Sequence, residues 1–135
     1  MTIIWDETLS INIYEIDKQH EKLISLVSDL HSAFMQNKHS GHLNKDILQS
    51  MLDFTKEHFL YEERYMEKIC YPDILFHKVF HSRFLKKITI YKEKIQKRKL
   101  FLNRDMMIEL MEWLQHHIKT EDKKITLFEW SQLKL

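Results

Sequence analysis

The sequence contains very little glycine, proline or cysteine. One glycine and one proline occur in 135 residues. Because sheets and hairpins need turn residues, this scarcity excludes most β-rich folds and predicts a chain that is almost entirely helical. The single cysteine, Cys70, cannot form a disulfide within the chain, which suits a reducing cytoplasm. We expect its thiol to be packed among other side chains rather than reactive.

Long apolar runs and an excess of charge of one sign are also missing. No uninterrupted apolar stretch approaches the roughly 18 residues that a membrane span requires. The start, MTIIWDETLS, lacks the basic and then apolar pattern of a signal peptide. With a formal net charge of +1, no global field favours nucleic acid or an anionic membrane. We therefore expect a cytoplasmic protein without membrane insertion or a nucleic-acid partner; the sequence identifies no protein partner.

Apolar residues at helical spacing are abundant. They recur three or four positions apart in four segments, which predicts helices over about 18–37, from about residue 44, from Pro72 and from Asn103. Asp17 and Asn103 are the expected N-caps of the first and fourth helices, and Pro72 is expected in the first turn of the third. Since short loops make successive helices antiparallel neighbours, the predicted fold class is all-α, an up-down-up-down antiparallel four-helix bundle with an extended N-terminal arm.

The length suits one domain. We expect an N-terminal arm over 1–16, a bundle over about 17–122 and a C-terminal tail over 123–135, in which residues 125–130 can form another short helix. The only glycine falls in a polar loop over 37–44. Four apolar residues are expected to anchor the arm: Trp5, Ile11, Ile13 and Tyr14.

Ionisable residues occupy positions on the predicted inward faces of all four helices. Two pairs are spaced four residues apart, which places both members of each pair on one face of a helix. Buried without partners, such groups would each cost kilocalories, against a total stability of roughly 5–15 kcal/mol. Taken singly, each histidine suits an ordinary core or surface role; together they favour a metal site. The set is His20, His58, Glu62, His77, His81, His117 and Asp122.

The stretch WLQHHIKTED, residues 113–122, holds two adjacent histidines. Neighbouring positions point about 100° apart, so His116 and His117 cannot both face inward. Asp122 follows His117 by five residues, which puts it about 140° away on a regular helix. For both to face the interior, the helix must end or widen into a π-like turn between them.

The donor set also restricts the metal. Its seven members exceed the ligands of one tetrahedral zinc ion. Imidazole and carboxylate ligands without thiolate suit iron, with zinc or manganese also possible. If both carboxylates and one solvent-derived oxygen bridge two metals, the five imidazoles divide three and two. One metal then has six ligands, and the other keeps a vacant position that suits one small molecule.

The sequence resembles the hemerythrin family, and specifically the single-domain bacteriohemerythrins. Four blocks carry the family pattern of a lone His, then HxxxE, HxxxH and HxxxxD: IDKQHEKL (16–23), HFLYEERYM (58–66), YPDILFHKVFH (71–81) and WLQHHIKTED (113–122). The resemblance implies two non-haem iron ions, bridged by an oxo or hydroxo group, that bind O2 reversibly. It implies His77, His81 and His117 on the closed iron, His20 and His58 on the iron with the vacancy, and Glu62 and Asp122 as bridges.

A small dry O2 pocket is expected beside the vacancy. The residues expected to form its wall are Leu23, Phe59, Trp113, Leu114 and Ile118, for which ordinary core packing is an equal alternative. His116 is expected to face outward, and His31, His39 and His42, which match no motif position, are read as surface or loop residues.

The resulting prediction is an O2 carrier, storage or delivery protein, and not an enzyme. The spacing is rich in histidine and lacks the Glu-x-x-His of ferritin-like oxidases. Nothing places an acid or base beside the vacancy. Two alternatives remain: an O2-sensing or interaction module that acts on a separate partner, and a di-iron peroxidase or NO-scavenging enzyme.

Overall fold

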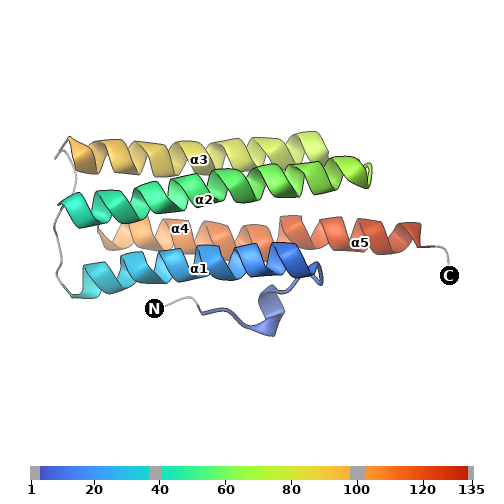
Figure 1. Ribbon diagram of the computed structural model, residues 1–135, viewed down its shortest axis with the longest axis horizontal. Coiled ribbons are helices and arrows are strands. Elements are labelled where there is room, and N and C mark those ends of the chain that lie inside the picture. Colours follow the sequence, from blue (N-terminus) through green and yellow to red (C-terminus); the bar gives the residue numbers. More distant parts are fainter. Residues whose placement is uncertain (1–3, 37–40, 98–102, 134–135) are drawn as a thin grey trace.

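The structure is a computed structural model that describes residues 4–36, 41–97 and 103–133, with side chains in the second segment described from residue 45. The described residues form helices and no strand. In Figure 1, α1 to α4 lie along the long axis with alternating direction, and α5 continues α4, so the predicted all-α four-helix bundle is confirmed. The elements are η1 (Glu7–Leu9), α1 (Tyr14–Met35), α2 (Gly41–Lys68), α3 (Ile74–Gln96), α4 (Arg104–His117), η2 (Ile118–Asp122) and α5 (Lys123–Gln132).

The start of α1 differs from the prediction. The helix begins at Tyr14, and Asp17 lies inside its first turn instead of capping it. The Asp17 carboxylate accepts hydrogen bonds from the Ile11 amide at 2.8 Å and from the Ser10 hydroxyl at 2.5 Å. Asp17 therefore ties the arm to the helix, because its oxygens bind the chain that precedes the helix.

The arm is anchored by partly different residues than expected. Ile11 is 1% exposed, and Trp5 and Ile13 pack against the core as predicted. Tyr14 was expected to be an anchor, but this prediction is wrong: it is 70% exposed, because the first residue of α1 faces outward. Leu9, which is 1% exposed in the short 3-10 helix η1, takes the anchoring role instead.

The second and third helices also start at different residues than predicted. α2 begins at Gly41 and not at about residue 44, while residues 37–40 of the predicted loop lie outside the described residues. α3 begins at Ile74 after Asp73, so Pro72 lies in the preceding turn and not in the helix.

A tight turn after α2 explains why α3 begins at Ile74 and not at Pro72. The Tyr71 amide donates to the Met66 carbonyl and the Cys70 amide to the Glu67 carbonyl, which is the Schellman arrangement that closes a helix. Cys70 has the positive φ (58°) that this arrangement requires. Its side chain is exposed, so the predicted packed thiol is wrong.

The C-terminal third follows the predictions closely. The Asn103 side chain accepts a hydrogen bond from the Met106 amide at 3.1 Å and caps α4. η2 is a turn of π-helix over Ile118–Asp122, and α5 covers the predicted short helix over 125–130.

Two apolar clusters fill the interior. The larger includes Leu30, Leu48, Ile88 and Leu110, each 0% exposed, and it also contains Leu9 and Ile11 of the N-terminal arm. The smaller consists of Met66, Tyr71 and Ile125, which lie close to the α2–α3 turn. No helix among the described residues is long and apolar enough to cross a lipid bilayer.

Candidate metal centre

The seven predicted ligand residues meet between these two apolar clusters. α1 contributes one histidine, α2 a histidine and a glutamate, α3 two histidines and α4 one, while the aspartate ends η2. Each is at most 4% exposed, although all seven are ionisable. They are His20, His58, Glu62, His77, His81, His117 and Asp122.

The π-helical turn brings both ends of the HxxxxD motif to the centre. His117 is 4% exposed and Asp122 is 0% exposed. The Asp122 Oδ1 lies 3.0 Å from His117 Nε2, and its Oδ2 lies 3.0 Å from His20 Nε2 on α1. An α-helix would turn a residue five positions later away from the first, so the wider turn makes this approach possible.

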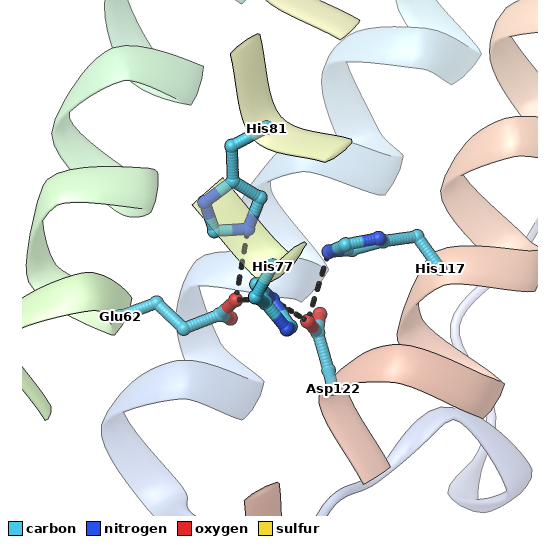
Figure 2. Close-up of side chains that lie close together, drawn as sticks. All are labelled: Glu62, His77, His81, His117 and Asp122. Atoms are coloured by element: carbon cyan, nitrogen blue, oxygen red, sulfur yellow. Dashed lines mark hydrogen bonds and ion pairs between the residues drawn. The ribbon is translucent and has the colours of Figure 1, made fainter. Parts of the chain in front are cut away.

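Glu62 lies between histidines of three helices. Its Oε1 is 2.8 Å from His77 Nε2 and 3.1 Å from His81 Nε2. Its Oε2 is 3.3 Å from His58 Nε2 and 3.6 Å from His20 Nε2. Figure 2 shows Glu62 and Asp122 facing each other, with the rings of His77, His81 and His117 around them. Each carboxylate therefore presents its two oxygens to two different sets of imidazoles.

The donor atoms form two overlapping groups, in each of which the ligand atoms lie within 4.8 Å of one another. Both groups contain the same two carboxylates, and they differ in the number of histidines. The larger group is Glu62, His77, His81, His117 and Asp122, and the smaller is His20, His58, Glu62 and Asp122.

The orientation of these atoms fits metal ions better than mutual hydrogen bonds. Nε2 of His20 and of His117 and both oxygens of Asp122 are buried without a hydrogen-bond partner in the described segments. Each of these two Nε2 atoms nevertheless lies 3.0 Å from an oxygen of Asp122, so the atoms point into a shared space and not along N–H···O lines. Buried atoms of this kind cost free energy unless something between them binds both. Imidazole and carboxylate groups are ligands that suit iron, so the seven buried residues fit a site for iron ions.

The buried carboxylates and histidines of the centre strongly shift one another's pKa values. Burial alone raises the pKa of Glu62, but the imidazoles of His20, His58, His77 and His81 beside its carboxylate lower it well below its ordinary value. Burial and the charge of Glu62 raise the pKa of Asp122, but His117 and His20 outweigh both and lower it.

The histidines respond in opposite directions. Burial lowers the pKa of His20 and of His77, yet the nearby carboxylates of Asp122 and Glu62 raise the two pKa values to about 9 and about 10. Burial lowers the pKa of His58 despite its contact with Glu62. Positive charge close to the two buried carboxylates therefore stabilises them. Protons on some of the histidines provide such charge, and a pair of divalent cations would provide it directly.

Two of the ligand histidines contact, through the Nδ1 atom that faces away from the centre, residues that were not predicted to belong to the site. His58 Nδ1 lies 2.7 Å from Gln19 Oε1, and His81 Nδ1 lies 2.8 Å from Glu63 Oε2. Each of these partners is the sequence neighbour of a predicted ligand. That adjacency is the signal that could have found them, because a residue next to an inward one points about 100° away, toward a neighbouring helix.

The five residues expected to wall an O2 pocket are mostly buried. Leu23, Leu114 and Ile118 are at most 2% exposed, and Phe59 is 3% exposed. The Phe59 ring stacks on the His81 ring with centroids 3.6 Å apart, and partly buried Trp113 stacks on His117 at 4.4 Å. These contacts bring Phe59 and Trp113 next to the donor groups.

The remaining histidines lie away from the centre. His116 is exposed, as predicted, and His31 is half-buried on α1. His39 and the side chain of His42 fall outside the described residues.

A family model described as "Hemerythrin HHE cation binding domain" matches residues 12–126. The chain belongs to the hemerythrin family. It is 31% identical over 123 residues to a protein named bacteriohemerythrin from Stenotrophomonas maltophilia (strain R551-3), a match that covers 90% of this chain and 77% of that protein. It is 26% identical over 121 residues to a hemerythrin polypeptide of Sipunculus nudus, covering 90% and 88% of the two chains.

Solved structures agree on the fold. A crystal structure of wild-type hemerythrin matches with a TM-score of 0.86 and 23% identity, covering 94% of this chain and 97% of that one. The hemerythrin domain binds a non-haem di-iron centre, and the buried cluster of histidines and carboxylates is able to hold metal ions. Family and fold together support an oxygen-binding di-iron protein.

Proposed function

We propose that this hemerythrin-family chain binds O2 reversibly and acts in its transport, storage or delivery. The observation that carries the proposal is the unequal pair of donor groups: three histidines in one and two in the other, with Glu62 and Asp122 common to both. Two metal ions that shared both carboxylates and one solvent-derived oxygen would have six and five ligands. The second ion would then keep one position for a small molecule.

In this proposal the larger group holds the closed iron and the smaller group the iron with the free position. The carboxylates of Glu62 and Asp122 would be shared by the two ions, an assignment supported by the approach of each to histidines of both groups. The ligands of the closed iron are His77, His81 and His117, and those of the other iron are His20 and His58.

The surrounding residues serve to exclude water. A pair of ferrous ions supplies the two electrons that reversible binding of O2 requires. We assign Leu23, Phe59, Trp113, Leu114 and Ile118 to the wall of the O2 pocket, an assignment supported by the stacking of Phe59 on His81 and of Trp113 on His117. A dry, low-dielectric surrounding protects the bound state from protons of bulk water.

Binding is favoured over catalysis by what the site contains. Each buried carboxylate at the centre already lies against two or more histidines, so neither is free to act as a general acid or base toward a substrate. We therefore assign no enzymatic turnover. Sensing through a partner would use the same oxygenation and would add a partner whose affinity changes with it.

The test is expression with iron, followed by metal counting and visible spectroscopy under cycles of air and argon. Two irons per chain and one long-lived oxygenated spectrum that disappears under argon are expected. Successive intermediates with net consumption of O2 would instead establish an enzyme.

Adjacent histidines provide a matched pair of variants. His117→Ala should lose paired iron and oxygenation, because it removes a donor of the closed iron. His116→Ala, which alters an exposed neighbour, should retain both. Two irons and unchanged oxygenation in His117→Ala would show the ligand assignment to be wrong.

A further inference from the structure

Two of the central histidines are each held from behind by a residue of another helix. Gln19 of α1 contacts His58 of α2, and Glu63 of α2 contacts His81 of α3, at 2.7 and 2.8 Å. Both contacts use the Nδ1 atom, while Nε2 of the same ring faces the carboxylates at the centre. Each outer residue thus connects the helix on which it lies to a donor of the next helix.

These contacts select the ring tautomer. When the imidazole Nδ1–H donates to the oxygen of Gln19 or Glu63, the lone pair of Nε2 is left free to face the centre. Both histidines are at most 2% exposed, so water does not compete readily for the Nδ1 proton. The outer residues therefore orient the donors in the form that binds a metal.

The two outer residues differ in charge. Glu63 has a carboxylate side chain that is 22% exposed, while Gln19 has a neutral amide. An anionic acceptor withdraws the Nδ1 proton more strongly than an amide and so increases electron donation from Nε2. The histidines they hold also lie in different donor groups: His81 is in the larger and His58 in the smaller.

We propose that Glu63 and Gln19 are positioning residues that make the two irons chemically unequal. Glu63, through His81, stabilises the higher positive charge of the closed iron and lowers its reduction potential. Gln19 orients His58 at the other iron without adding charge. The inference rests on the proposed ligand assignment and adds a source of asymmetry beyond the three-to-two division of histidines.

The central test compares Glu63→Gln with Glu67→Gln in iron-loaded protein. Glu67 lies one turn further along α2 and pairs with Lys78 of α3, so its variant removes the same charge from the same face. Glu63→Gln keeps an oxygen acceptor for His81 but loses the charge. Spectroelectrochemical titration should show a higher midpoint potential in Glu63→Gln, with two irons retained, and a potential close to that of the wild type in Glu67→Gln.

The reciprocal variant tests the other half of the proposal. Gln19→Glu places a carboxylate behind His58 and should shift the midpoint potential downward. Glu63→Leu, which removes both charge and acceptor, should weaken iron binding by about 10- to 100-fold in competition with a chelator, as is typical when the partner of a ligating histidine is lost.

Zinc-loaded protein provides a readout that does not depend on redox chemistry. Selective ¹⁵N labelling of histidine should show a slowly exchanging Nδ1–H for His81, shifted further downfield than that of His58. The His81 signal should move upfield in Glu63→Gln and exchange fast in Glu63→Leu.

The outcomes separate this inference from the proposed function. If the wild type loads two irons and oxygenates but Glu63→Gln and Glu67→Gln have the same potential, the inference is overturned and the proposed function stands. If the wild type fails to bind paired iron, both are overturned. A shift in Glu63→Gln alone, with a downward shift in Gln19→Glu, supports the inference.

Discussion

The two ends of the bundle consist of the same four helices but are stabilised by opposite means. In the half away from the α2–α3 turn, residues such as Leu30, Leu48 and Leu110 are fully buried and apolar. Toward the turn, the same inward faces carry seven buried ionisable groups. Burial of an apolar side chain stabilises by about 1.5–3 kcal/mol, whereas burial of an unpaired charge or polar group costs free energy.

The comparison indicates that different parts of the bundle stabilise the fold and position the donor residues. The apolar half and the small cluster of Met66, Tyr71 and Ile125 hold the helices in place on both sides of the donors. The donors can therefore remain close together although two carboxylates lie among them. The apolar half should determine stability without metal, and the polar layer should contribute most when metal is bound.

The largest effect is expected from Glu62→Ala in the polar layer. Its carboxylate faces histidines of α1, α2 and α3, so its removal should abolish loading of both irons. The variant should also lose the stabilisation by bound metal, about 4 kcal/mol at a free metal concentration 1,000 times Kd. Metal counting and unfolding with and without iron measure both effects. Glu57→Ala, an exposed position on α2, is the control; two irons in Glu62→Ala would contradict the prediction.

In the apolar half, Leu110→Ala should cost about 2–5 kcal/mol of unfolding free energy, because it leaves a cavity where the residue is 0% exposed. Iron content should remain at two per chain. Denaturant unfolding together with metal counting tests the separation of the two halves. Leu60→Ala, at a 49% exposed position of α2, should change stability by no more than about 0.5 kcal/mol. Loss of iron in Leu110→Ala would show that the halves are coupled.

The two forms of the protein should respond to pH in opposite directions. In iron-free protein the raised pKa values of His20 and His77, about 9 and about 10, mean that the folded state favours their protonated forms. The stabilisation that the protonated His20 and His77 give the folded state is fully present below the ordinary histidine pKa of about 6.5. It is lost as the pH rises through 9 to 10. Iron-loaded protein should instead lose stability on acidification, because protons compete with metal for the same atoms.

Thermal unfolding of the iron-free and iron-loaded forms between pH 5 and pH 10, in steps of about one unit on either side of the histidine pKa, checks this. Plots of unfolding temperature against pH for the iron-free and iron-loaded forms are expected to cross. Parallel curves would mean that the histidines of the polar layer do not exchange protons for metal.

The smallest effect is expected at the edge of the apolar half, where Asn103 caps α4. Asn103→Ala removes the acceptor of the Met106 amide and should cost about 1 kcal/mol, with no change in iron content. Asn103→Asp keeps an acceptor and should stay near the wild type. Equal destabilisation by both variants in chemical unfolding would assign the effect to something other than the cap.

Local rules of the sequence predicted much of the fold and of the site. The spacing of four between His58 and Glu62 and between His77 and His81 placed each pair on one helix face, and all four are buried. The spacing of five before Asp122 predicted that the helix ends or widens into a π-like turn, since no regular α-helix brings both ends of HxxxxD to one side, and the structure shows the π-helical turn.

Helix ends were predicted less well, because capping depends on contacts beyond the local pattern. Asp17 was expected to cap α1 but binds the arm instead, where Ser10 and Ile11 offer donors. Cys70 was expected to be packed, but the left-handed backbone of the turn places it at the surface. In both cases the deciding interaction involves backbone geometry that residue type alone does not specify.

The sequence by itself determined which faces turn inward and which donor types they carry, since helical periodicity is a property of the local chain. Only the tertiary structure decided which donor atoms lie within 4.8 Å of one another and that Gln19 and Glu63 contact His58 and His81. Those relations depend on the separation and rotation of neighbouring helices. The packing of the apolar side chains along the bundle sets both quantities, and no local pattern encodes them.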